Sequence, residues 1–511
     1  MNGLPIHTMW DVWSNAAHKF PRKAAAIWLD RPYTYAELDR AVANLSTRLA
    51  RDFALAKGDR LAIAAPNCIE FYMSYWAAMR LGVVLVPVNT RLRGDTMAFI
   101  VNETEARVLI VHKDLAGTIA QIRDKLGGVE KFVSVGYESP DAVPFETLLG
   151  PVDSPAAPCD SLTADDIAVI VYTSGTTGVP KGPVITHGNL LYNIKNTIIP
   201  HSFRHEDVHL LVVPLFHCTG LNSIITTSAY LASTVVIAPY PNVKELVSLI
   251  ERHRITTFLG VPTLFHFVTA MKDLGEHDLS SLKLIAYSGS PMPPETIRRL
   301  RQKFPGVWLH NFFGLTETVS ITHVLSDRDA DSRPESIGKV LPDVGQKIID
   351  EKGNEAPPGT VGELCFHRSE IIREYWKRPD LLGQSMVGEW FRTGDLALID
   401  EDGYVYLKGR KKDMIIVGGE NVYALEVEMV LLSHEKVLEA AVVGVKATGA
   451  RAYLGELVKA VVVPRDPSLT EAELKRFCTD KLTSYQVPQI IEFRETLPRT
   501  PSGKVMKAEL K

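Results

Sequence analysis

The chain has few of the features that mark secreted or membrane-spanning proteins. Its 511 residues include only five cysteines, which lie far apart and form no Cys-x-x-Cys pair, so we expect neither a disulfide framework nor a zinc site. No apolar run approaches the length of a membrane span, and residues 1–10 lack the basic and apolar regions of a signal peptide. We therefore expect a protein of a reducing, cytoplasmic compartment with no membrane span.

The chain also lacks an excess of positive charge. Its formal net charge is −4, which argues against nucleic acid or an anionic membrane as the main partner. Hydrophobic residues make up 46% and charged residues 23% of the chain, as in ordinary globular proteins. A chain of this length exceeds one hydrophobic core and should form at least two domains.

Helix and strand signals alternate to about residue 286. The run Thr34-Tyr35-Ala36-Glu37 is typical of a capping box, and residues 61–65 and 69–79 read as a buried strand and a helix. Such alternation predicts sheets covered by helices.

The pattern changes after about residue 340, where short strands and the hairpin signal Asp402-Gly403 indicate a small β-rich subdomain. A boundary near Arg410 then precedes a second βα pattern. We expect an α/β fold with a large N-terminal domain at 1–410, whose β-rich subdomain spans about 340–410, and a C-terminal α+β domain at 411–511.

Residues 172–182 are the most informative stretch. Their sequence, Tyr-Thr-Ser-Gly-Thr-Thr-Gly-Val-Pro-Lys-Gly, follows an apolar run of strand length at 167–171. Backbone N–H groups and hydroxyls in such a loop can surround phosphate oxygens. The spacing is not that of a Walker A loop. A solvated surface loop has a similar composition, but the leading strand and the following Pro-Lys-Gly favour phosphate binding by Thr173, Ser174, Gly175, Thr176, Thr177, Gly178 and Lys181.

This loop resembles the phosphate loop of the adenylate-forming superfamily, which holds the acyl-CoA synthetases, the adenylation domains of peptide synthetases and the luciferases. Further motifs follow in the superfamily's order across nearly the whole chain. The resemblance implies ATP, Mg²⁺ and coenzyme A as cofactors, and a C-terminal domain that moves between two half-reactions.

The resemblance also assigns a nucleotide site. In the run 311–317, Asn311 would bond the adenine amino group, Phe313 would stack on adenine, and Thr316 would hold the α-phosphate. Glu317 would ligate magnesium. Further residues assigned to ATP or AMP are Gly289, Ser290, Pro291, Phe312, Gly314, Asp395 for the ribose hydroxyls, and Arg410 for the ribose and phosphates.

Catalytic and moving residues follow from the same resemblance. Lys504, in Pro-Ser-Gly-Lys, would bridge the carboxylate and the α-phosphate and stabilise the transition state. His217 would gate the acyl pocket or position the carboxylate, whereas a lone histidine is otherwise a hydrogen-bonded core residue. Gly418 and Gly419 would enter the site for thioester formation, with Lys412 as the hinge.

The acyl pocket is expected to be formed by His217, Thr219, Ser223, Tyr287, Phe312 and Val319. These residues include no cation for a second carboxylate, which favours a carboxylic acid with an uncharged aryl or aliphatic tail. Phe312 stands where the superfamily frequently has glycine and should shorten or reshape the pocket. Gln486 stands where a cationic residue is common, which weakens the expected grip on the nucleotide end of coenzyme A.

The sequence thus predicts an ATP-dependent carboxylic acid–CoA ligase that acts through an acyl-adenylate and yields acyl-CoA, AMP and pyrophosphate. Two alternatives stay open. The acceptor could be the phosphopantetheine of a carrier protein, or the chain could be a non-catalytic relic that binds nucleotide. The combined presence of Lys181, Glu317, Asp395, Arg410 and Lys504 argues against a relic.

Overall fold

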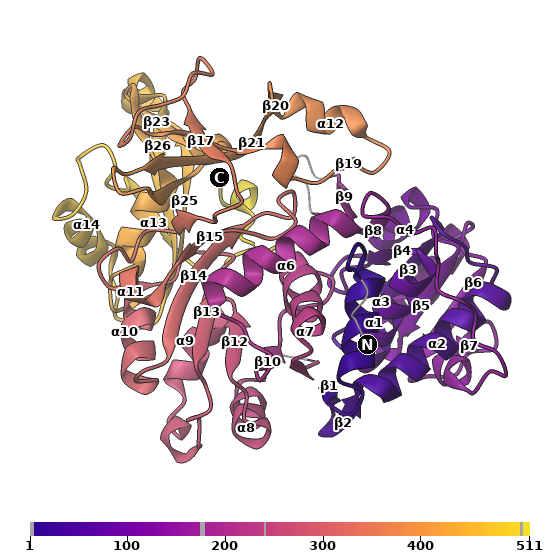
Figure 1. The fold of residues 1–511 in the computed structure, drawn as a ribbon. Helices are drawn as coiled ribbons and strands as arrows, with labels where there is room; N and C mark the ends of the chain where they lie inside the picture. The colour runs from indigo at the N-terminus through magenta and orange to yellow at the C-terminus, as the bar shows by residue number, and fades with distance from the viewer. Residues whose placement is uncertain (1–4, 174–178, 240–241, 501–503) are drawn as a thin grey trace.

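The computed structural model describes residues 5–173, 179–239, 242–500 and 504–511. A large N-terminal part contains two sheets with helices packed on them, and a smaller α+β domain lies beside one end of it (Figure 1). This arrangement confirms the predicted α/β class. Within the described residues, no helix is both long and apolar enough to cross a membrane.

The larger sheet runs through most of the N-terminal part. Its strands from β14 to β1 are parallel neighbours, whereas those from β14 toward β17 are antiparallel. In spatial order the strands are β17 (Gln346–Ile349), β18 (Gly362–His367), β21 (Trp390–Ile399), β22 (Tyr404–Arg410), β16 (Gly338–Val340), β15 (Ile321–Leu325), β14 (Trp308–Gly314), β13 (Leu284–Tyr287), β12 (Thr257–Gly260), β10 (Val208–Leu211), β11 (Thr234–Ile237), β1 (Ala24–Trp28) and β2 (Arg31–Thr34), with β20 (Met386–Val387) beside β21.

Most strands of the β-rich segment at about 340–410 belong to the outer half of this sheet, whereas the short strand Glu374–Tyr375 pairs with Pro183–Thr186. The outer strands connect to the parallel strands through β15, which pairs with β16 on one side and with β14 on the other. The assignment of residues 340–410 to a separate β-rich subdomain stays a prediction.

The second sheet is formed by eight strands. In spatial order they are β19 (Glu374–Tyr375), β9 (Pro183–Thr186), β8 (Ile167–Ile170), β4 (Val84–Pro87), β3 (Arg60–Ala64), β5 (Val108–His112), β6 (Lys131–Val135) and β7 (Val143–Pro144). One apolar core joins residues of both sheets with large side chains such as Trp13 and Trp76. Burial of this continuous core fixes the two sheets against each other.

Helices pack on both sheets. Those of the N-terminal part are α1 (Met9–Lys19), α2 (Tyr35–Arg51), α3 (Ile69–Leu81), α4 (Gly94–Glu103), α5 (Ala116–Ile122), α6 (His187–His201), α7 (Thr226–Leu231), α8 (Val243–His253), α9 (Pro262–Ala270), α10 (Pro294–Lys303), α11 (Asp327–Ala330) and α12 (Pro379–Gln384). The π-helical segment η4 (Thr219–Ile225) leads directly into α7.

The C-terminal domain follows the single turn η7 (Lys411–Asp413). It contains the hairpin β23 (Ile415–Val417) and β24 (Glu420–Val422), and the sheet β25 (Val437–Lys446), β26 (Glu456–Pro464) and β27 (Ile490–Phe493). Helices α13 (Ala424–Leu432) and α14 (Glu471–Thr479) pack on that sheet around its own apolar core.

Local predictions agree with these elements. Thr34 caps α2 and forms the expected capping box with Glu37. The strand expected at 61–65 is β3, the helix expected at 69–79 is α3, and Asp402-Gly403 turns between β21 and β22. The carboxyl ends of the parallel strands β12, β13 and β14 meet at one edge, where open α/β sheets bind ligands.

Candidate active site

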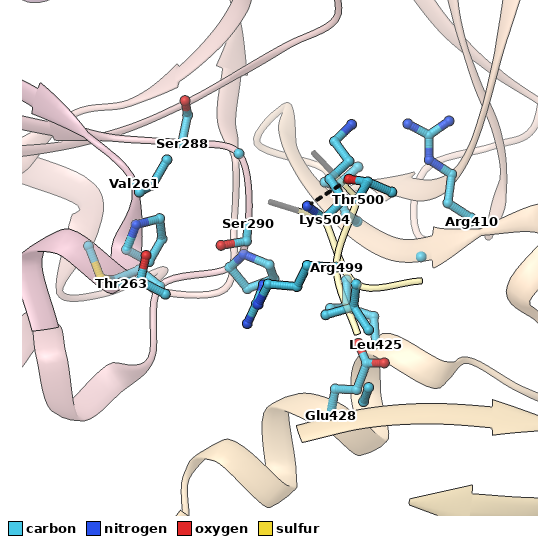
Figure 2. A pocket seen from close by; sticks show the side chains of 18 of the residues that line it. Val261, Thr263, Ser288, Ser290, Arg410, Leu425, Glu428, Arg499, Thr500 and Lys504 are labelled. Carbon is cyan, nitrogen blue, oxygen red and sulfur yellow. Dashed lines mark hydrogen bonds between the residues drawn. The ribbon is translucent and has the colours of Figure 1, made fainter. Parts of the chain in front are cut away.

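A cavity of about 3300 Å³ lies between the N-terminal part and the C-terminal domain. The loops that follow β12, β13 and β14 form one wall, and residues of the C-terminal domain form the opposite wall. Figure 2 shows part of it, with Val261 and Ser288 on one side and Arg410, Leu425 and Lys504 on the other.

Most of the described residues that the sequence assigned to a site line this cavity. They are Thr173, Lys181, His217, Thr219, Gly289, Ser290, Pro291, Asn311, Phe312, Phe313, Gly314, Thr316, Glu317, Asp395, Arg410, Lys412 and Lys504. Segments separated by more than three hundred positions are thus brought to one place.

Other assigned residues do not line the described cavity. Ser223 and Val319 are buried, Tyr287 packs into an apolar core, and Gly418 and Gly419 form the exposed turn between β23 and β24. Their assigned roles stay predictions. Ser174, Gly175, Thr176, Thr177 and Gly178 lie outside the described residues.

The two ends of the predicted phosphate loop are paired. Thr173 N–H donates to the Lys181 carbonyl at 2.8 Å, and Lys181 N–H donates back to the Thr173 carbonyl at 3.1 Å. The Lys181 ammonium lies 5.4 Å from the ring centroid of Tyr375, within the range of a cation–π contact. The pairing holds Thr173 and Lys181 at the cavity wall.

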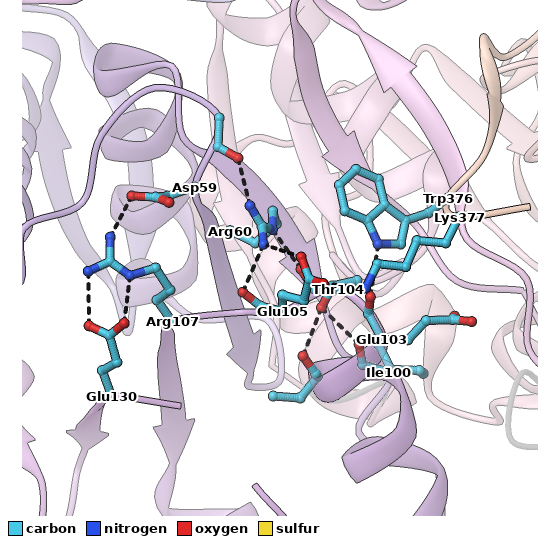
Figure 3. Close-up of polar contacts among 12 residues, drawn as sticks. Asp59, Arg60, Ile100, Glu103, Thr104, Glu105, Arg107, Glu130, Trp376 and Lys377 are labelled. Carbon is cyan, nitrogen blue, oxygen red and sulfur yellow. Dashed lines mark hydrogen bonds and ion pairs between the residues drawn. The ribbon is translucent and has the colours of Figure 1, made fainter. Parts of the chain in front are cut away.

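A polar cluster anchors both ends of this loop. Glu103, at the end of α4, accepts hydrogen bonds from the Tyr172 hydroxyl at 2.6 Å and from the Arg378 guanidinium at 2.6 Å. The Trp376 indole N–H donates to the Glu103 carbonyl at 2.9 Å, as Figure 3 shows, and Trp376 N–H donates to the Gly182 carbonyl at 2.7 Å. The segment 375–378 is therefore fastened beside the loop.

Tyr375 of this segment and Ile372 just before it contact Glu317. The Tyr375 hydroxyl donates to Glu317 Oε1 at 2.9 Å, and Ile372 N–H donates to the Glu317 carbonyl at 2.8 Å. Burial raises the pKa of Tyr375, and the neighbouring Glu317 carboxylate raises it further, so the phenol stays protonated and donates. The Tyr375 hydroxyl thus holds Oε1 of the Glu317 carboxylate, and the second oxygen, Oε2, takes no part in this hydrogen bond.

Asp395 is a buried carboxylate with one oxygen held and one left over. Its Oδ1 accepts from Arg410 Nε at 2.7 Å, while within the described residues its buried Oδ2 has no hydrogen-bond partner. Burial raises the pKa of Asp395 to about 6, although the charges of Arg410 and Lys504 oppose this shift. An unpaired buried acceptor at a cavity wall fits a ligand that donates hydrogen bonds, such as a sugar hydroxyl.

Lys504 extends into the cavity from the C-terminal domain. Its backbone N–H donates to Thr500 Oγ1 at 3.1 Å, and Figure 2 shows it in the space between Ser290 and Arg410. Burial raises the pKa of Asp395 and the Cys218 thiolate raises that of His217, and the Lys504 charge is close enough to oppose both shifts. The structure thus places the predicted catalytic lysine in the same cavity as the predicted nucleotide-binding residues.

His217 lies next to Cys218 on the cavity wall. Cys218 Sγ is 3.6 Å from His217 Nδ1, and the Thr316 hydroxyl points at the same sulfur from 3.8 Å. The thiolate form of Cys218 raises the pKa of His217. Burial opposes ionisation of Cys218, but His217, the Thr316 hydroxyl and the Lys504 charge together outweigh it, and the pKa of the thiol is lowered.

The predicted adenine wall is formed by β14 and the turn after it. Phe313 is half-buried and meets the His323 ring edge-on at 5.9 Å between centroids. The Asn311 amide N–H donates to the Ser336 carbonyl at 3.1 Å, which leaves its oxygen as an acceptor. A Cβ at Gly314 would lie 1.5 Å from the Ser320 carbonyl oxygen, so only glycine fits there.

Glu363 connects the Asp395 turn to the interdomain segment. It accepts from Gly394 N–H at 3.1 Å, from Arg392 at 2.6 Å and from Lys411 Nζ at 3.3 Å. Lys411 precedes the predicted hinge Lys412, which is exposed in η7. Sequence reasoning missed Glu363, Tyr375 and Cys218 because their roles arise from contacts across the fold and no local pattern marks them.

The described residues of this cavity offer few side chains arranged as metal ligands. Among the residues that the structure describes, no group of three or more His, Cys, Asp or Glu side chains is arranged to hold a metal. Magnesium is commonly held by one or two carboxylates together with substrate phosphates and water. The single carboxylate Glu317 beside Thr316 fits that kind of site.

Two family profiles match the chain. The AMP-binding enzyme profile matches residues 13–376, and the AMP-binding enzyme C-terminal domain profile matches residues 426–504. The large N-terminal part and the smaller C-terminal domain therefore each have a counterpart in one family.

Curated relatives match over almost their full length. A long-chain-fatty-acid–CoA ligase of Escherichia coli is 31% identical, over 98% of this chain and 93% of the relative. A feruloyl-CoA synthase of Amycolatopsis is 33% identical, over 94% of this chain and 93% of the relative.

Solved structures agree in fold. An anthranilate CoA ligase in complex with anthranoyl-AMP has a TM-score of 0.92 at 28% identity, over 100% of this chain and 98% of that one. The o-succinylbenzoate CoA synthetase of Bacillus subtilis with ATP and magnesium has 0.86 at 28%, over 98% and 99%. An amide bond synthetase of Marinactinospora thermotolerans has 0.89 at 25%, over 98% and 99%. The chain belongs to the AMP-binding enzyme family and is an adenylate-forming enzyme.

Proposed function

We propose that the protein is a carboxylic acid–CoA ligase that forms an acyl-adenylate and then transfers the acyl group to coenzyme A. The observation that carries this proposal is the single cavity that joins Glu317 and Asp395 of the N-terminal part to Lys504 of the C-terminal domain. Adenylation requires a triphosphate, a nucleoside and a carboxylate to be held in line, and these residues supply the matching chemistry.

The nucleoside would lie between Phe313 and the turn at Gly289, Ser290 and Pro291. The free oxygen of the Asn311 amide could accept from the adenine amino group, and the unpartnered Oδ2 of Asp395 could accept from a ribose hydroxyl. Arg410 already holds the other Asp395 oxygen and would add positive charge toward the phosphates.

The phosphates would lie between Lys181, Thr316 and the loop that includes Ser174 to Gly178. Glu317 would hold Mg²⁺ together with phosphate oxygens, and the metal would neutralise charge as pyrophosphate leaves. Tyr375 would act through Glu317, because its donated hydrogen bond fixes the orientation of that carboxylate.

In the first half-reaction a carboxylate oxygen of the acid attacks the α-phosphorus of ATP and the bond to pyrophosphate breaks. Lys504 would stabilise the negative charge shared by the carboxylate and the α-phosphate during this step. His217 would lie beside the reacting carboxylate, with Thr219 and Phe312 on the acyl side of it.

In the second half-reaction the sulfur of coenzyme A attacks the acyl carbon and AMP leaves with the bridging oxygen. Gly418 and Gly419 would take part here, although their turn lies away from the cavity in this structure. A rotation near Lys412 would exchange the Lys504 loop for this turn, which is the physical role we propose for the hinge.

Coenzyme A is the proposed acceptor because curated relatives that match the chain over nearly its full length are named as CoA ligases or synthases. An amine is a competing acceptor, because an amide bond synthetase has a similar fold. A carrier-protein phosphopantetheine is a third candidate from the sequence. All three share the first half-reaction and differ only in the nucleophile of the second.

The test is pyrophosphate release across a panel of aryl and aliphatic acids with Mg-ATP, with and without coenzyme A. The proposal predicts acid-dependent pyrophosphate release, followed by consumption of the free thiol and formation of AMP. Transfer to an added amine or to a phosphopantetheine carrier in preference to coenzyme A would identify another acceptor. No acid-dependent release would refute adenylation itself.

A further inference from the structure

A short chain of buried polar groups ends at the cavity wall. Asn193 of α6, Ser223 of η4 and Ser320, next to β15, are 2%, 4% and 4% exposed. Ser320 lines the cavity, whereas the other two lie behind it. Ser223 is four residues after Thr219 on the same short helix and contacts Ser320, so Ser320 lies toward the part of the cavity where Thr219 would face the acid.

The donor and acceptor of each hydrogen bond among these three residues can be assigned starting from Asn193. One terminal atom of its amide lies 2.7 Å from the Asn222 carbonyl oxygen and 3.2 Å from Ser223 Oγ. A carbonyl oxygen only accepts, so this atom is the amide nitrogen and donates to both. The other atom accepts from Ile321 N–H at 3.5 Å, which agrees with this assignment.

Ser223 accepts one hydrogen bond of this series and donates the next. Its oxygen accepts from Asn193, and its hydroxyl donates to Ser320 Oγ at 2.8 Å. A hydroxyl has one hydrogen, so the bond to Ser320 uses the only hydrogen that Ser223 has. Ser320 is thereby the acceptor and keeps its own hydrogen.

Among the hydrogen bonds of the described residues, none has the Ser320 hydroxyl as its donor; its oxygen accepts from Ser223. A buried donor without a partner is unfavourable, and a cavity-lining donor finds its partner in a bound ligand. Thr219, on the same short helix as Ser223, is uncharged and also lines the cavity.

We infer that Ser320 is a specificity-determining residue, and that the preferred acids carry an uncharged hydrogen-bond acceptor on their tail. An ether, hydroxyl or carbonyl oxygen would accept from Ser320, because Asn193 and Ser223 orient that hydroxyl as a donor. This inference rests on the proposed function and narrows its substrate class. A plain hydrocarbon tail would leave the donor unpaired and bind less tightly.

The test compares isosteric acids that differ only in this acceptor. Methoxybenzoates are paired with ethylbenzoates at each ring position, and oxa-alkanoates with alkanoates of equal length. We expect one pair in which the acceptor-bearing acid has about 10-fold higher kcat/KM for pyrophosphate release. In Ser320→Ala this ratio should fall to about 1, and in Ser320→Thr, which keeps the hydroxyl, it should be largely retained.

A binding measurement separates specificity from catalysis. Acyl-sulfamate adenosines carrying the same paired tails should bind the wild type with the same preference and bind Ser320→Ala with none. Equal kcat/KM within every pair in the wild type would overturn the inference, as would a preference that survives in Ser320→Ala. If no acid in either series releases pyrophosphate, both the proposed function and this inference fail. If only the plain acids release pyrophosphate, the proposed function stands and only the role of Ser320 is refuted.

Discussion

The hydroxyl of Tyr375 donates a hydrogen bond to Oε1 of Glu317 across 58 positions of sequence, at 2.9 Å. Burial keeps the phenol protonated, and the ring also lies beneath the Lys181 ammonium. One side chain therefore contacts both the proposed magnesium ligand and the lysine of the phosphate loop. Residues that orient a metal ligand affect metal affinity nearly as strongly as the ligand itself.

Tyr375→Phe should raise the magnesium concentration for half-maximal pyrophosphate release by about 10-fold, because the ring stays and only the orienting bond is lost. Glu317→Gln should raise it further, since the charge itself is removed. At saturating magnesium, the KM for ATP of Tyr375→Phe should match the wild type. An unchanged magnesium titration in both variants would contradict the proposed metal site.

Lys504→Ala should lower the rate of adenylation by about 100- to 1000-fold while the protein stays folded, because the exposed lysine stabilises charge only in the first transition state. Thioester formation from supplied acyl-adenylate should survive. The two half-reactions are measured separately, by pyrophosphate exchange and by thiol consumption. Lys511→Ala, at the end of the same domain, is a control for general loss of positive charge. Equal loss in both half-reactions would remove Lys504 from its assigned role.

Adenosine binding should weaken as the pH falls below about 6. The pKa of Asp395 is raised to about 6 by burial, and only the ionised carboxylate can accept from both ribose hydroxyls. Affinity should fall by about 10-fold for each pH unit below the pKa. Adenosine is used because it has no phosphate that titrates in this range. Asp395→Asn should bind weakly with a flat profile, and a pH-independent wild type would contradict the assignment.

The same group makes the opposite contribution to stability. Because its native pKa lies above the unfolded value of about 4, its contribution to the free energy of unfolding is present below about pH 4 and is lost as the pH rises through about 6. Comparing the unfolding free energies of wild type and Asp395→Asn across this range checks the sign independently of any ligand.

Phe312→Gly should extend acceptance toward longer or wider acids. The ring is 6% exposed, lines the cavity and meets the His201 ring edge-on at 5.7 Å, so it separates the cavity from the core behind it. Its removal also creates a void that costs about 3–5 kcal/mol of stability. Phe312→Leu is the matched variant, with a smaller void and a smaller change in acids accepted. An identical substrate profile in both variants would refute the role of this ring.

Lys412→Pro should leave adenylation largely intact and impair thioester formation. The residue lies in the single 3₁₀ turn η7, whose φ values proline tolerates, but a fixed φ prevents a second backbone state. Lys412→Ala controls for loss of the charge and should affect neither half-reaction. Equal impairment of both half-reactions by proline would mean that the residue is structural.

Much of the fold could be predicted because its signals are local. The Thr34 capping box and the Asp402-Gly403 hairpin depend on neighbours within a few residues. The contact of Tyr375 with Glu317 and the relay from Asn193 to Ser320 depend on which strands lie side by side, and no spacing in the sequence encodes that.

Tyr287 illustrates the limit at the level of one side chain. It is the last residue of β13 and directly precedes Ser288, which lines the cavity. Its side chain nevertheless belongs to the apolar core that includes Ile285 and Phe258. Side chains alternate between the two faces of a strand, so the face that meets the cavity at this position could not be fixed without the sheet's packing.

The most direct test of the central claim follows oxygen from the acid to the nucleotide. An accepted acid labelled with ¹⁸O in its carboxylate is turned over with Mg-ATP and coenzyme A, and the AMP and thioester are examined by mass spectrometry. An acyl-adenylate route predicts one labelled oxygen in the phosphate of AMP and the other in the thioester carbonyl. Unlabelled AMP, or ADP in its place, would contradict this account of the chemistry.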